Sequence, residues 1–411
     1  MKVYIGKKTA AGTFIAPPSK SFCHRALICA ALARGESVLH GIYPSADALA
    51  TADCLSALGA DIRFDSDTAY VRGFDPLSAV PKVSLRCDES GSTLRFLTAV
   101  ALLSKSKITL CGTEKLFSRP LSEYEKICSA QGLTFEKGID FVSVCGRLKS
   151  GVYNVSAEAS SQFASGLMMA LPLLPGDSTI ILSGKVASRS YLLITAEVMR
   201  AFGAEIKIRK NEIQIKGGTK YTPREYTVEG DCSGAAFFEA MNRLGGDIKI
   251  TGLNPESVQG DRIFSQYFDE ICSRHPTLDI TDCPDLAPVL MALGAAKHGV
   301  TLTGTARLRL KESDRGSAMA EELGKLGIKT ELSDDTLTVF KGDIKPPATP
   351  IVSHKDHRIV MAMAVLLMLT GGEIDGAEDV KKSFPDFWER LSALGAEASV
   401  VPYAMILFSR A

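Results

Sequence analysis

Two kinds of hydrophobic pattern alternate along the chain. In the first, a stretch of alternating apolar residues ends at a glycine, and after a polar loop comes a segment with leucines at three- and four-residue spacing. The alternation predicts a strand, and the wider spacing predicts an amphipathic helix that ends in a glycine-containing turn. Clear copies begin at Glu36, Ser178 and Val300, a more degraded copy begins at Gly372, and two weaker copies begin at Lys107 and Asp247.

The second pattern precedes each copy of the first. It is a helical segment that begins with small polar residues and continues as an almost unbroken apolar run. The six segments are SKSFCHRALICAALA from Ser19, SGSTLRFLTAVALL from Ser90, SSQFASGLMMALPLL from Ser160, CSGAAFFEAMNRL from Cys232, CPDLAPVLMALGAA from Cys283 and SHKDHRIVMAMAVLL from Ser353. Helices that are apolar on every side are buried on every side. With starts about 50 to 72 residues apart, the segments predict six βαβαββ-like units with interior helices, an α/β fold.

At 411 residues the chain exceeds the roughly 100–150 residues typical of one domain. Six units divide naturally into two domains of three, residues 14–225 and residues 1–13 with 226–411, because TPREYTVE interrupts the pattern near Tyr221–Glu229. The first strand, KVYIG, has no interior helix before it, so we expect it to pair with the C-terminal units.

Charge and cysteine usage narrow the function. Lys plus Arg and Asp plus Glu are both 47, so no overall field favours nucleic acid or an anionic membrane, and anion binding has to come from local clusters. The ten cysteines form no CxxC pair, which is typical of reduced thiols in a cytosol. The start MKVYIGKK lacks the apolar core of a signal peptide, and the apolar run Ile359–Leu369 is shorter than the roughly 20 residues of a membrane span. We therefore expect a cytoplasmic protein.

Polar residues mark the starts of the apolar helices. If these helices run parallel, their N-termini converge, and the free N–H groups and partial positive charge there attract phosphates and carboxylates. Serine and aspartate are also ordinary caps, but a cation opposes the helix dipole, so Lys20 and Arg25 favour a bound anion. The candidate groups on helix starts are Lys20, Ser21, Arg25, Ser92, Arg95, Ser160, Ser161, Gln162, Asp285, His357 and Arg358, and those in loops are Arg119, Ser188, Arg189, Lys311, Glu312, Arg315 and Lys382.

Eight segments carry a family resemblance over the whole chain. They are PPSKSFCHRAL, ESGSTLRFL, SRPL, SSQFASGLMMALPLL, SRSYL, RLKESDR, DHRIVMA and KSFPDF. In order and spacing they resemble the signature segments of enolpyruvyl-shikimate-phosphate synthases. The resemblance implies a two-domain inside-out α/β barrel, with three repeats of buried parallel helices per domain and an active site in the interdomain cleft. It also implies transfer of enolpyruvate from phosphoenolpyruvate to shikimate 3-phosphate, in chorismate and aromatic amino acid biosynthesis, by a monomer that needs no metal or cofactor.

The resemblance also assigns roles to individual residues. It implies a shikimate 3-phosphate site of Lys20, Ser21, Arg25, Ser160, Ser161, Gln162, Ser188, Asp285 and Lys311. It implies a phosphoenolpyruvate site of Lys20, Gly91, Arg119, Gln162, Arg315, Arg358 and Lys382. Asp285 matches the proton acceptor and Glu312 the candidate acid, with Lys20 as a further catalytic group.

Three positions depart from the family pattern. Glu89 stands where many members have Asn, Arg307 where some have Asn, and Phe96 where plant-type sequences have Pro. Gly91 is retained, which in the family goes with room for the inhibitor glyphosate, but the change at Phe96 leaves that sensitivity open.

Three other interpretations compete with this one. The sister family that transfers enolpyruvate to UDP-N-acetylglucosamine has Asn after the first-helix lysine and a reactive loop cysteine, whereas here Ser21 follows Lys20 and FSRPL has no cysteine. A non-catalytic repeat scaffold would explain the periodicity but not the clustered charges. A metal-dependent hydrolase is suggested by the proximity of His354, Asp356 and His357, but the chain has no HExxH motif.

Overall fold

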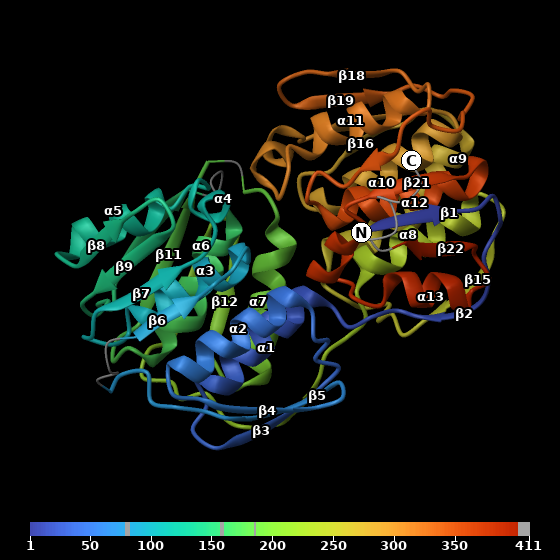
Figure 1. The fold of residues 1–411 in the computed structure, drawn as a ribbon. Helices are drawn as coiled ribbons and strands as arrows, with labels where there is room; N and C mark the ends of the chain where they lie inside the picture. Colours follow the sequence, from blue (N-terminus) through green and yellow to red (C-terminus); the bar gives the residue numbers. More distant parts are fainter. Residues whose placement is uncertain (79–82, 157–159, 185, 402–411) are drawn as a thin grey trace, which may run out of the picture. The chain divides into compact units, whose positions relative to one another are not determined.

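The chain forms two compact units, Pro18–Glu229 and Met1–Pro17 with Gly230–Ala411, which we call the N-terminal and C-terminal units (Figure 1). The structure, a computed structural model, describes residues 1–78, 83–156, 160–184 and 186–401. Each unit contains three helices that are buried along almost their whole length and three helices that cover them.

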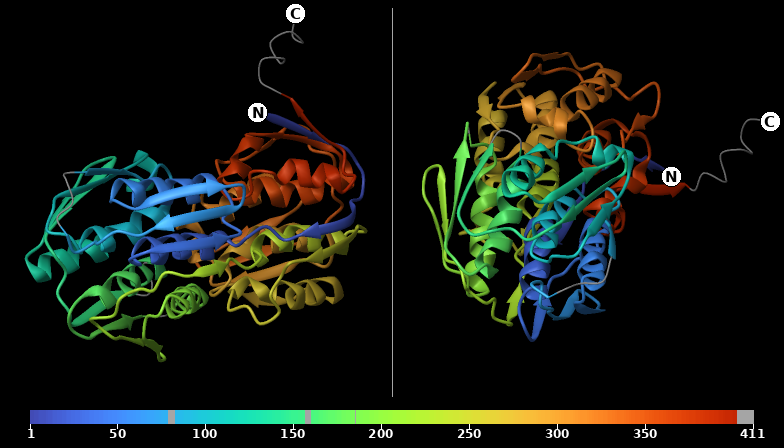
Figure 2. Two further views of the ribbon diagram at one scale, coloured as in Figure 1. Left: turned by 90° about the horizontal axis from the view of Figure 1, so that it is seen from below. Right: turned by 90° about the vertical axis from the view of Figure 1, so that its left-hand side faces the viewer.

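The buried helices of the N-terminal unit are the three predicted from the apolar runs. They are α1 (Lys20–Ala31), α3 (Gly91–Ala101) and α6 (Ser161–Ala170). The amphipathic segments form the partly exposed helices α2 (Ala46–Ala57), α5 (Ser122–Gln131) and α7 (Arg189–Ala201). The sheets lie outside the buried helices (Figure 2), and the side chains that they turn inward, such as Leu39, Leu110 and Ile180, are buried.

The C-terminal unit repeats this arrangement. Its buried helices are α8 (Cys232–Arg243), α10 (Ala287–Ala296) and α12 (His357–Thr370). Its outer helices are α9 (Phe264–Ser273), α11 (Arg315–Lys325) and α13 (Phe387–Ala393). The prediction of six interior helices is therefore confirmed.

Five sheets have four strands each and share one topology, in which the first two strands are parallel and the other pairs antiparallel. The first sheet of the N-terminal unit has the strand order β6 (Val83–Arg86), β7 (Ile108–Cys111), β9 (Phe141–Cys145), β8 (Thr134–Lys137). The second has the order β10 (Val152–Ser156), β11 (Ser178–Ser183), β13 (Glu212–Ile215), β12 (Ile206–Ile208). The third has the order β14 (Glu225–Thr227), β3 (Glu36–His40), β5 (Thr68–Arg72), β4 (Asp61–Asp65). Those of the C-terminal unit are β16 (Thr277–Asp279), β17 (Val300–Thr303), β19 (Thr336–Val339), β18 (Thr330–Leu332); and β20 (Ile351–Val352), β21 (Gly372–Asp375), β1 (Lys2–Ile5), β22 (Ala398–Val401). A two-stranded parallel sheet joins β2 (Ala11–Ile15) to β15 (Asp247–Thr251).

The first strand completes the last sheet. Strand β1 lies between β21 and β22, so that Val3 is opposite both Ile374 and Val400. In the other four-stranded sheets this third position belongs to a strand of the same repeat. The N-terminal strand thus pairs with the C-terminal units, as its sequence predicted.

The repeats give the described part of the chain a mixed α/β architecture of the inside-out type, with helices inside and sheets outside. None of its helices combines the length and the apolar character needed to cross a membrane.

Candidate active site

In the N-terminal unit, the first two turns of α1 carry Lys20 and Arg25, two of the predicted cations. The Lys20 Nζ atom lies 2.9 Å from Oδ2 of Asp47, which is in the first turn of α2. Ser19 is the N-cap residue of α1, but its side chain accepts no capping hydrogen bond. The start of α1 therefore has no side-chain cap and carries a lysine, a combination that suits anion binding.

Arg25 is almost fully buried, and its described partners are all neutral. Nε donates to Oγ1 of Thr195 at 2.6 Å, and Nη1 donates to the Ser21 carbonyl at 2.7 Å. Nη2 donates to the Tyr191 carbonyl at 3.3 Å, and the guanidinium carbon lies 4.9 Å from the ring centroid of Phe96. Burial lowers the pKa of Arg25 to about 10. The site thus holds a buried positive charge that these partners orient but do not neutralise.

The starts of α3 and α6 are joined by side-chain hydrogen bonds. Arg95 Nη1 donates to Oε1 of Gln162 at 2.7 Å, and Gln162 Nε2 donates to Oγ of Ser92 at 3.0 Å. A Cβ atom on Gly91 would lie 2.9 Å from Nη1 of Arg119 and 3.2 Å from Nη1 of Arg95. The structure therefore brings Gly91, Arg119 and Gln162 together, and the glycine permits the close approach of the two arginines.

Three more serines of the predicted site, Ser160, Ser161 and Ser188, lie at helix starts in this unit. Ser160 caps α6 by accepting from the Gln162 N–H at 3.2 Å, and Ser161 is the first residue of that helix. Ser188 is the buried N-cap residue of α7 and has a left-handed backbone, with φ of 58°. Non-glycine residues adopt this conformation at a cost, and such strain is concentrated at functional sites.

In the C-terminal unit, Asp285 is the centre of a dense ionic cluster. It lies in the 3₁₀ turn η3 (Pro284–Leu286) that leads into α10. Its Oδ1 is 3.2 Å from Nζ of Lys311 and 2.7 Å from Nη1 of Arg315. Its Oδ2 is 3.1 Å from Nη2 of Arg358, in the first turn of α12. The candidate proton acceptor therefore bonds to three cations.

Arg315 bonds to two further carboxylates. Its Nη2 lies 2.6 Å from Oε2 of Glu312, and its Nε lies 2.8 Å from Oδ2 of Asp356. Asp356 is fully buried and also caps α12 through the Arg358 N–H at 3.0 Å. Although burial opposes ionisation, the carboxylates of Asp356, Glu312 and Asp285 raise the pKa of Arg315 well above its ordinary range. Burial lowers the pKa of Lys311, with the Asp285 carboxylate acting against it.

A further acid lies near this cluster. Asp261, in the 3₁₀ turn η2 (Gly260–Ile263), accepts a hydrogen bond from Ser233 in the first turn of α8. Burial, followed by the negative charge of Asp285, raises the pKa of Asp261 to about 7. Asp285, in the turn before α10, therefore interacts electrostatically with Asp261 near the start of α8 and with Arg358 at the start of α12.

A further predicted cation is Lys382, and three positions depart from the family pattern, Arg307, Glu89 and Phe96. Lys382 is half-buried at the end of the 3₁₀ segment η5 (Ala377–Lys382), and Arg307 is half-buried in η4 (Ala306–Leu310). Glu89 is half-buried two residues before Gly91. Phe96 packs against the guanidinium of Arg25.

Sequence reasoning missed the partners that hold the cations. Asp47, Thr195 and Asp261 were not singled out, and Asp356 was considered only as part of a metal site. One signal could have indicated Asp356, since an aspartate directly before an apolar helical run is a typical N-cap. Nothing local pointed to Thr195, because its partner Arg25 is 170 residues away in the chain.

The structure gives His354 and Asp356 of the hydrolase interpretation different partners, while Nδ1 of His357 lies 3.8 Å from Oδ1 of Asp356. His354 Nε2 lies 2.7 Å from Oε1 of Glu322, whereas Asp356 binds Arg315. Among the described residues, Glu321, Glu322 and His354 do have ligand atoms within 4.8 Å of one another. However, the buried Glu322 is also 2.8 Å from Nζ of Lys325, and that cation opposes a metal ion at this position.

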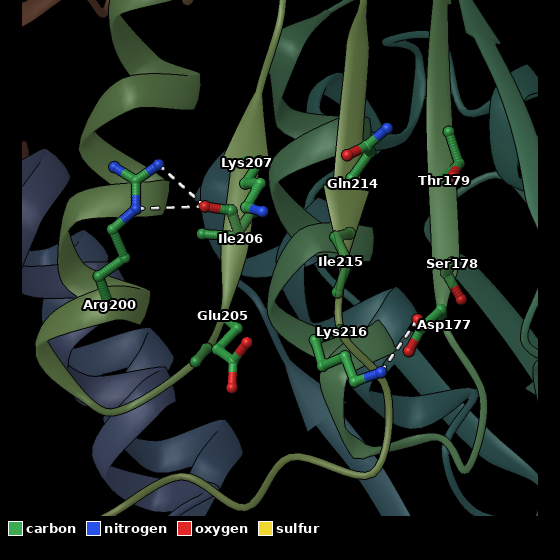
Figure 3. A pocket seen from close by; sticks show the side chains of 11 residues that line it. Asp177, Ser178, Thr179, Arg200, Glu205, Ile206, Lys207, Gln214, Ile215 and Lys216 are labelled. Carbon is green, nitrogen blue, oxygen red and sulfur yellow. Dashed lines mark hydrogen bonds and ion pairs between the residues drawn. The ribbon is translucent and has the colours of Figure 1, made fainter.

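A surface pocket of about 510 Å³ lies elsewhere in the N-terminal unit, beside β11, β12 and β13 (Figure 3). Its lining contains none of the predicted site residues. Lys216 lies 3.2 Å from Oδ2 of Asp177, and Arg200 donates to the Ile206 carbonyl at 3.0 Å. The pocket is therefore separate from the predicted site residues at the helix starts of this unit.

The fold and the cation-rich helix starts define an anion-binding protein of the inside-out α/β class. A family model described as EPSP synthase (3-phosphoshikimate 1-carboxyvinyltransferase) matches residues 5–391. The chain therefore belongs to the EPSP synthase family.

Individual relatives agree with this assignment. The 3-phosphoshikimate 1-carboxyvinyltransferase of Clostridium kluyveri is 40% identical over 403 residues, which covers 93% of this chain and 94% of the relative. That of Methanoculleus marisnigri is 37% identical over 408 residues, covering 93% and 96%. The solved EPSP synthase of Acinetobacter baumannii superposes with a TM-score of 0.78 at 26% identity, covering 97% of this chain and 100% of that one. The enolpyruvyl transferase NikO of Streptomyces tendae shares the fold, with a TM-score of 0.75 at 15% identity over 98% of this chain and 99% of its own.

Proposed function

We propose that this protein transfers the enolpyruvyl group of phosphoenolpyruvate to the 5-hydroxyl of shikimate 3-phosphate and releases phosphate. Membership of the EPSP synthase family and relatives named 3-phosphoshikimate 1-carboxyvinyltransferase support this activity, a step of aromatic amino acid biosynthesis. At the level of residues, the observation that carries the proposal is the ionic cluster around Asp285, which joins a carboxylate to Lys311, Arg315 and Arg358.

The groups of the N-terminal unit are assigned mainly to shikimate 3-phosphate. The buried charge of Arg25 and the start of α1, which has no side-chain cap, suit a phosphate dianion. Further proposed ligands of this substrate are Lys20, Ser21, Ser160, Ser161, Gln162 and Ser188, with Asp285 and Lys311 from the C-terminal unit.

The arginines are assigned mainly to phosphoenolpyruvate. A guanidinium binds a carboxylate or a phosphate bidentately, which fixes the orientation of a small, doubly anionic substrate. The proposed ligands are Arg119, Arg315, Arg358 and Lys382, with Lys20 and Gln162 contributing. Gly91, which has no side chain, leaves room for the close approach of Arg119 and Arg95.

The chemistry requires a base and an acid. We assign Asp285 to accept the proton of the 5-hydroxyl as that oxygen adds to C2 of phosphoenolpyruvate, and Glu312 to protonate C3. The tetrahedral intermediate then loses phosphate: the bond between C2 and the phosphate oxygen breaks, and a proton leaves C3. Lys20 stabilises the charge of the phosphate group during both steps. These roles need no metal or cofactor.

The assignment uses groups from both units, so we propose that they are the two catalytic domains and act on one substrate pair. Bound anions then favour closure, which excludes water from the intermediate. We further propose a monomer that acts in the cytoplasm, in keeping with its ten free cysteine thiols. Small-angle scattering and light scattering, each with and without shikimate 3-phosphate, test closure and monomer, and an unchanged radius of gyration counts against closure.

The deciding experiment measures phosphate release from phosphoenolpyruvate with shikimate 3-phosphate, and in parallel with UDP-N-acetylglucosamine. We expect release with the shikimate substrate only, and a loss of at least roughly 100-fold in Lys20→Ala, as for removal of one preorganised electrostatic group. Lys216→Ala, which removes a surface lysine paired with Asp177, is the matched control and should keep full activity. Release with the sugar nucleotide alone would assign the protein to the sister reaction, and release with neither would leave the scaffold interpretation.

A further inference from the structure

Three of the cations assigned to the substrates in the C-terminal unit are already bonded to anions of the chain itself. Lys311, Arg315 and Arg358 face the carboxylates of Asp285, Glu312 and Asp356, so three positive charges meet three negative ones. A balanced cluster gives an incoming anion little net attraction. Binding therefore requires an exchange of partners.

The hydrogen bonds of Arg315 show how many of its N–H donors are already in use. A guanidinium has five N–H donors, one on Nε and two on each terminal nitrogen. Here Nε donates to Asp356, Nη1 to Asp285, and Nη2 to both Glu312 and Asp356. One donor on Nη1 remains, which is too few for a bidentate pair with a new carboxylate or phosphate.

The three carboxylates differ in how firmly they are held. Asp356 has no exposed surface, caps α12 and accepts from Oγ of Ser313 at 3.1 Å. The side chains of Asp285 and Glu312 are 15% and 14% exposed, so a ligand can reach them. Within the described hydrogen bonds, Lys311, Arg315 and Arg358 all donate to Asp285, and Arg315 also donates to Glu312. The carboxylate whose displacement frees most cation capacity is therefore that of Asp285.

We propose that Asp285 is the resting occupant of an anion site formed by Lys311, Arg315 and Arg358, and that phosphoenolpyruvate binds by displacing it. This inference rests on the proposed function, because that function places phosphoenolpyruvate at Arg315 and Arg358. The exchange has a chemical consequence. A carboxylate bonded to three cations is a weak base, and once displaced it regains the basicity needed to accept the hydroxyl proton. Substrate binding and activation of the base are thereby the same event.

The test is equilibrium binding of phosphoenolpyruvate and of inorganic phosphate, measured by calorimetry without shikimate 3-phosphate. Asp285→Asn keeps the size of the side chain but removes the competing charge. We expect it to bind both probes roughly 10- to 100-fold more tightly than the wild type, as for freeing charge-assisted hydrogen bonds, although it loses turnover. Glu321→Gln is the matched control, because it removes an exposed carboxylate from α11, the helix that begins at Arg315. It should bind both probes like the wild type.

Glu312→Gln provides a second variant in case Asp285→Asn unfolds, which thermal unfolding would reveal. It frees a donor of Arg315 only, so its gain in affinity should be smaller, about 3- to 10-fold. Unchanged or weaker binding of both probes in a folded variant overturns the displacement. The outcome is separate from that of the proposed function: wild-type turnover without tighter binding refutes only the displacement, and tighter binding without wild-type turnover refutes only the reaction.

Discussion

Gly91→Ala tests whether the close approach at the start of α3 serves substrate binding. The new methyl group would lie 2.9 Å from Nη1 of Arg119 and 3.2 Å from Nη1 of Arg95, and both distances are shorter than ordinary contacts. Arg95 is 6% exposed and fixed by bonds to Gln162 and the Pro120 carbonyl. Arg119 is half-buried, and its guanidinium makes no hydrogen bond within the described part of the chain. The methyl group should therefore move Arg119.

The size of the effect follows from that displacement. The contact needs only a few tenths of an ångström of relief, and the group that moves is the end of a flexible side chain. A charge-assisted hydrogen bond to the substrate, worth roughly 1.5–3 kcal/mol, is then weakened rather than lost. Half of this range is roughly 0.75–1.5 kcal/mol, which corresponds to about a 4- to 12-fold rise in KM for phosphoenolpyruvate. The KM for shikimate 3-phosphate and the kcat should change by less than about twofold, because no proposed base or acid moves.

Steady-state kinetics with each substrate varied in turn measure these values. Gly324→Ala, at an exposed position of α11 where an added Cβ meets nothing within 4 Å, is the matched control and should leave both KM values unchanged. If Gly91→Ala leaves the KM for phosphoenolpyruvate unchanged, or raises both KM values equally, Arg119 does not bind phosphoenolpyruvate from this position.

Three further predictions concern stability, measured by urea unfolding. Gly324→Ala should raise the free energy of unfolding by about 0.5–1 kcal/mol, because alanine restricts the unfolded chain more than glycine does; a decrease would mean that the helix has no room there. Asp356→Asn should lower it by about 3 kcal/mol, because Arg315 loses a buried ionic partner, and a change below about 1 kcal/mol would contradict that pairing. Burial raises the pKa of Asp261 from 3.8 to about 7, so the folded protein keeps a proton that the unfolded chain loses as the pH rises through this range. This group therefore lowers the stability of the wild type as the pH rises between these values. From pH 5 to 7 the free energy of unfolding of Asp261→Asn should increase relative to that of the wild type by about 1 kcal/mol per pH unit, and parallel pH profiles of the two proteins would contradict the raised pKa.

The sequence predicted the elements of this fold well because their causes are local. The apolar run Ile359–Leu369 lies within a single buried helix, and Gly41 and Gly304 follow strands as the repeat pattern indicated. The candidate cations were also found locally, since a lysine or arginine at a helix start is unusual in its own sequence context.

The partners of those cations could not be found in this way. Asp47 lies 27 residues from Lys20, and Asp356 lies 41 residues from Arg315, so nothing in either local sequence indicates the pairing. Which carboxylate meets which cation is decided by how the repeats pack around the interior helices. That packing is a property of the whole unit, and only the structure reveals it.

The buried Arg25 of the N-terminal unit has neutral partners, whereas the buried Arg315 of the C-terminal unit has carboxylate partners. This difference affects how each arginine binds an anion. The described partners of Arg25 are hydroxyls, carbonyls and an aromatic ring, and burial lowers its pKa to about 10. Arg315 is surrounded by carboxylates that raise its pKa. A buried cation without a counter-ion gains most when an anion arrives, whereas a neutralised one gains only the difference between two anions. In the proposed reaction, the Arg25 site can therefore accept the phosphate of shikimate 3-phosphate directly, while phosphoenolpyruvate has to compete with Asp285 for Arg315.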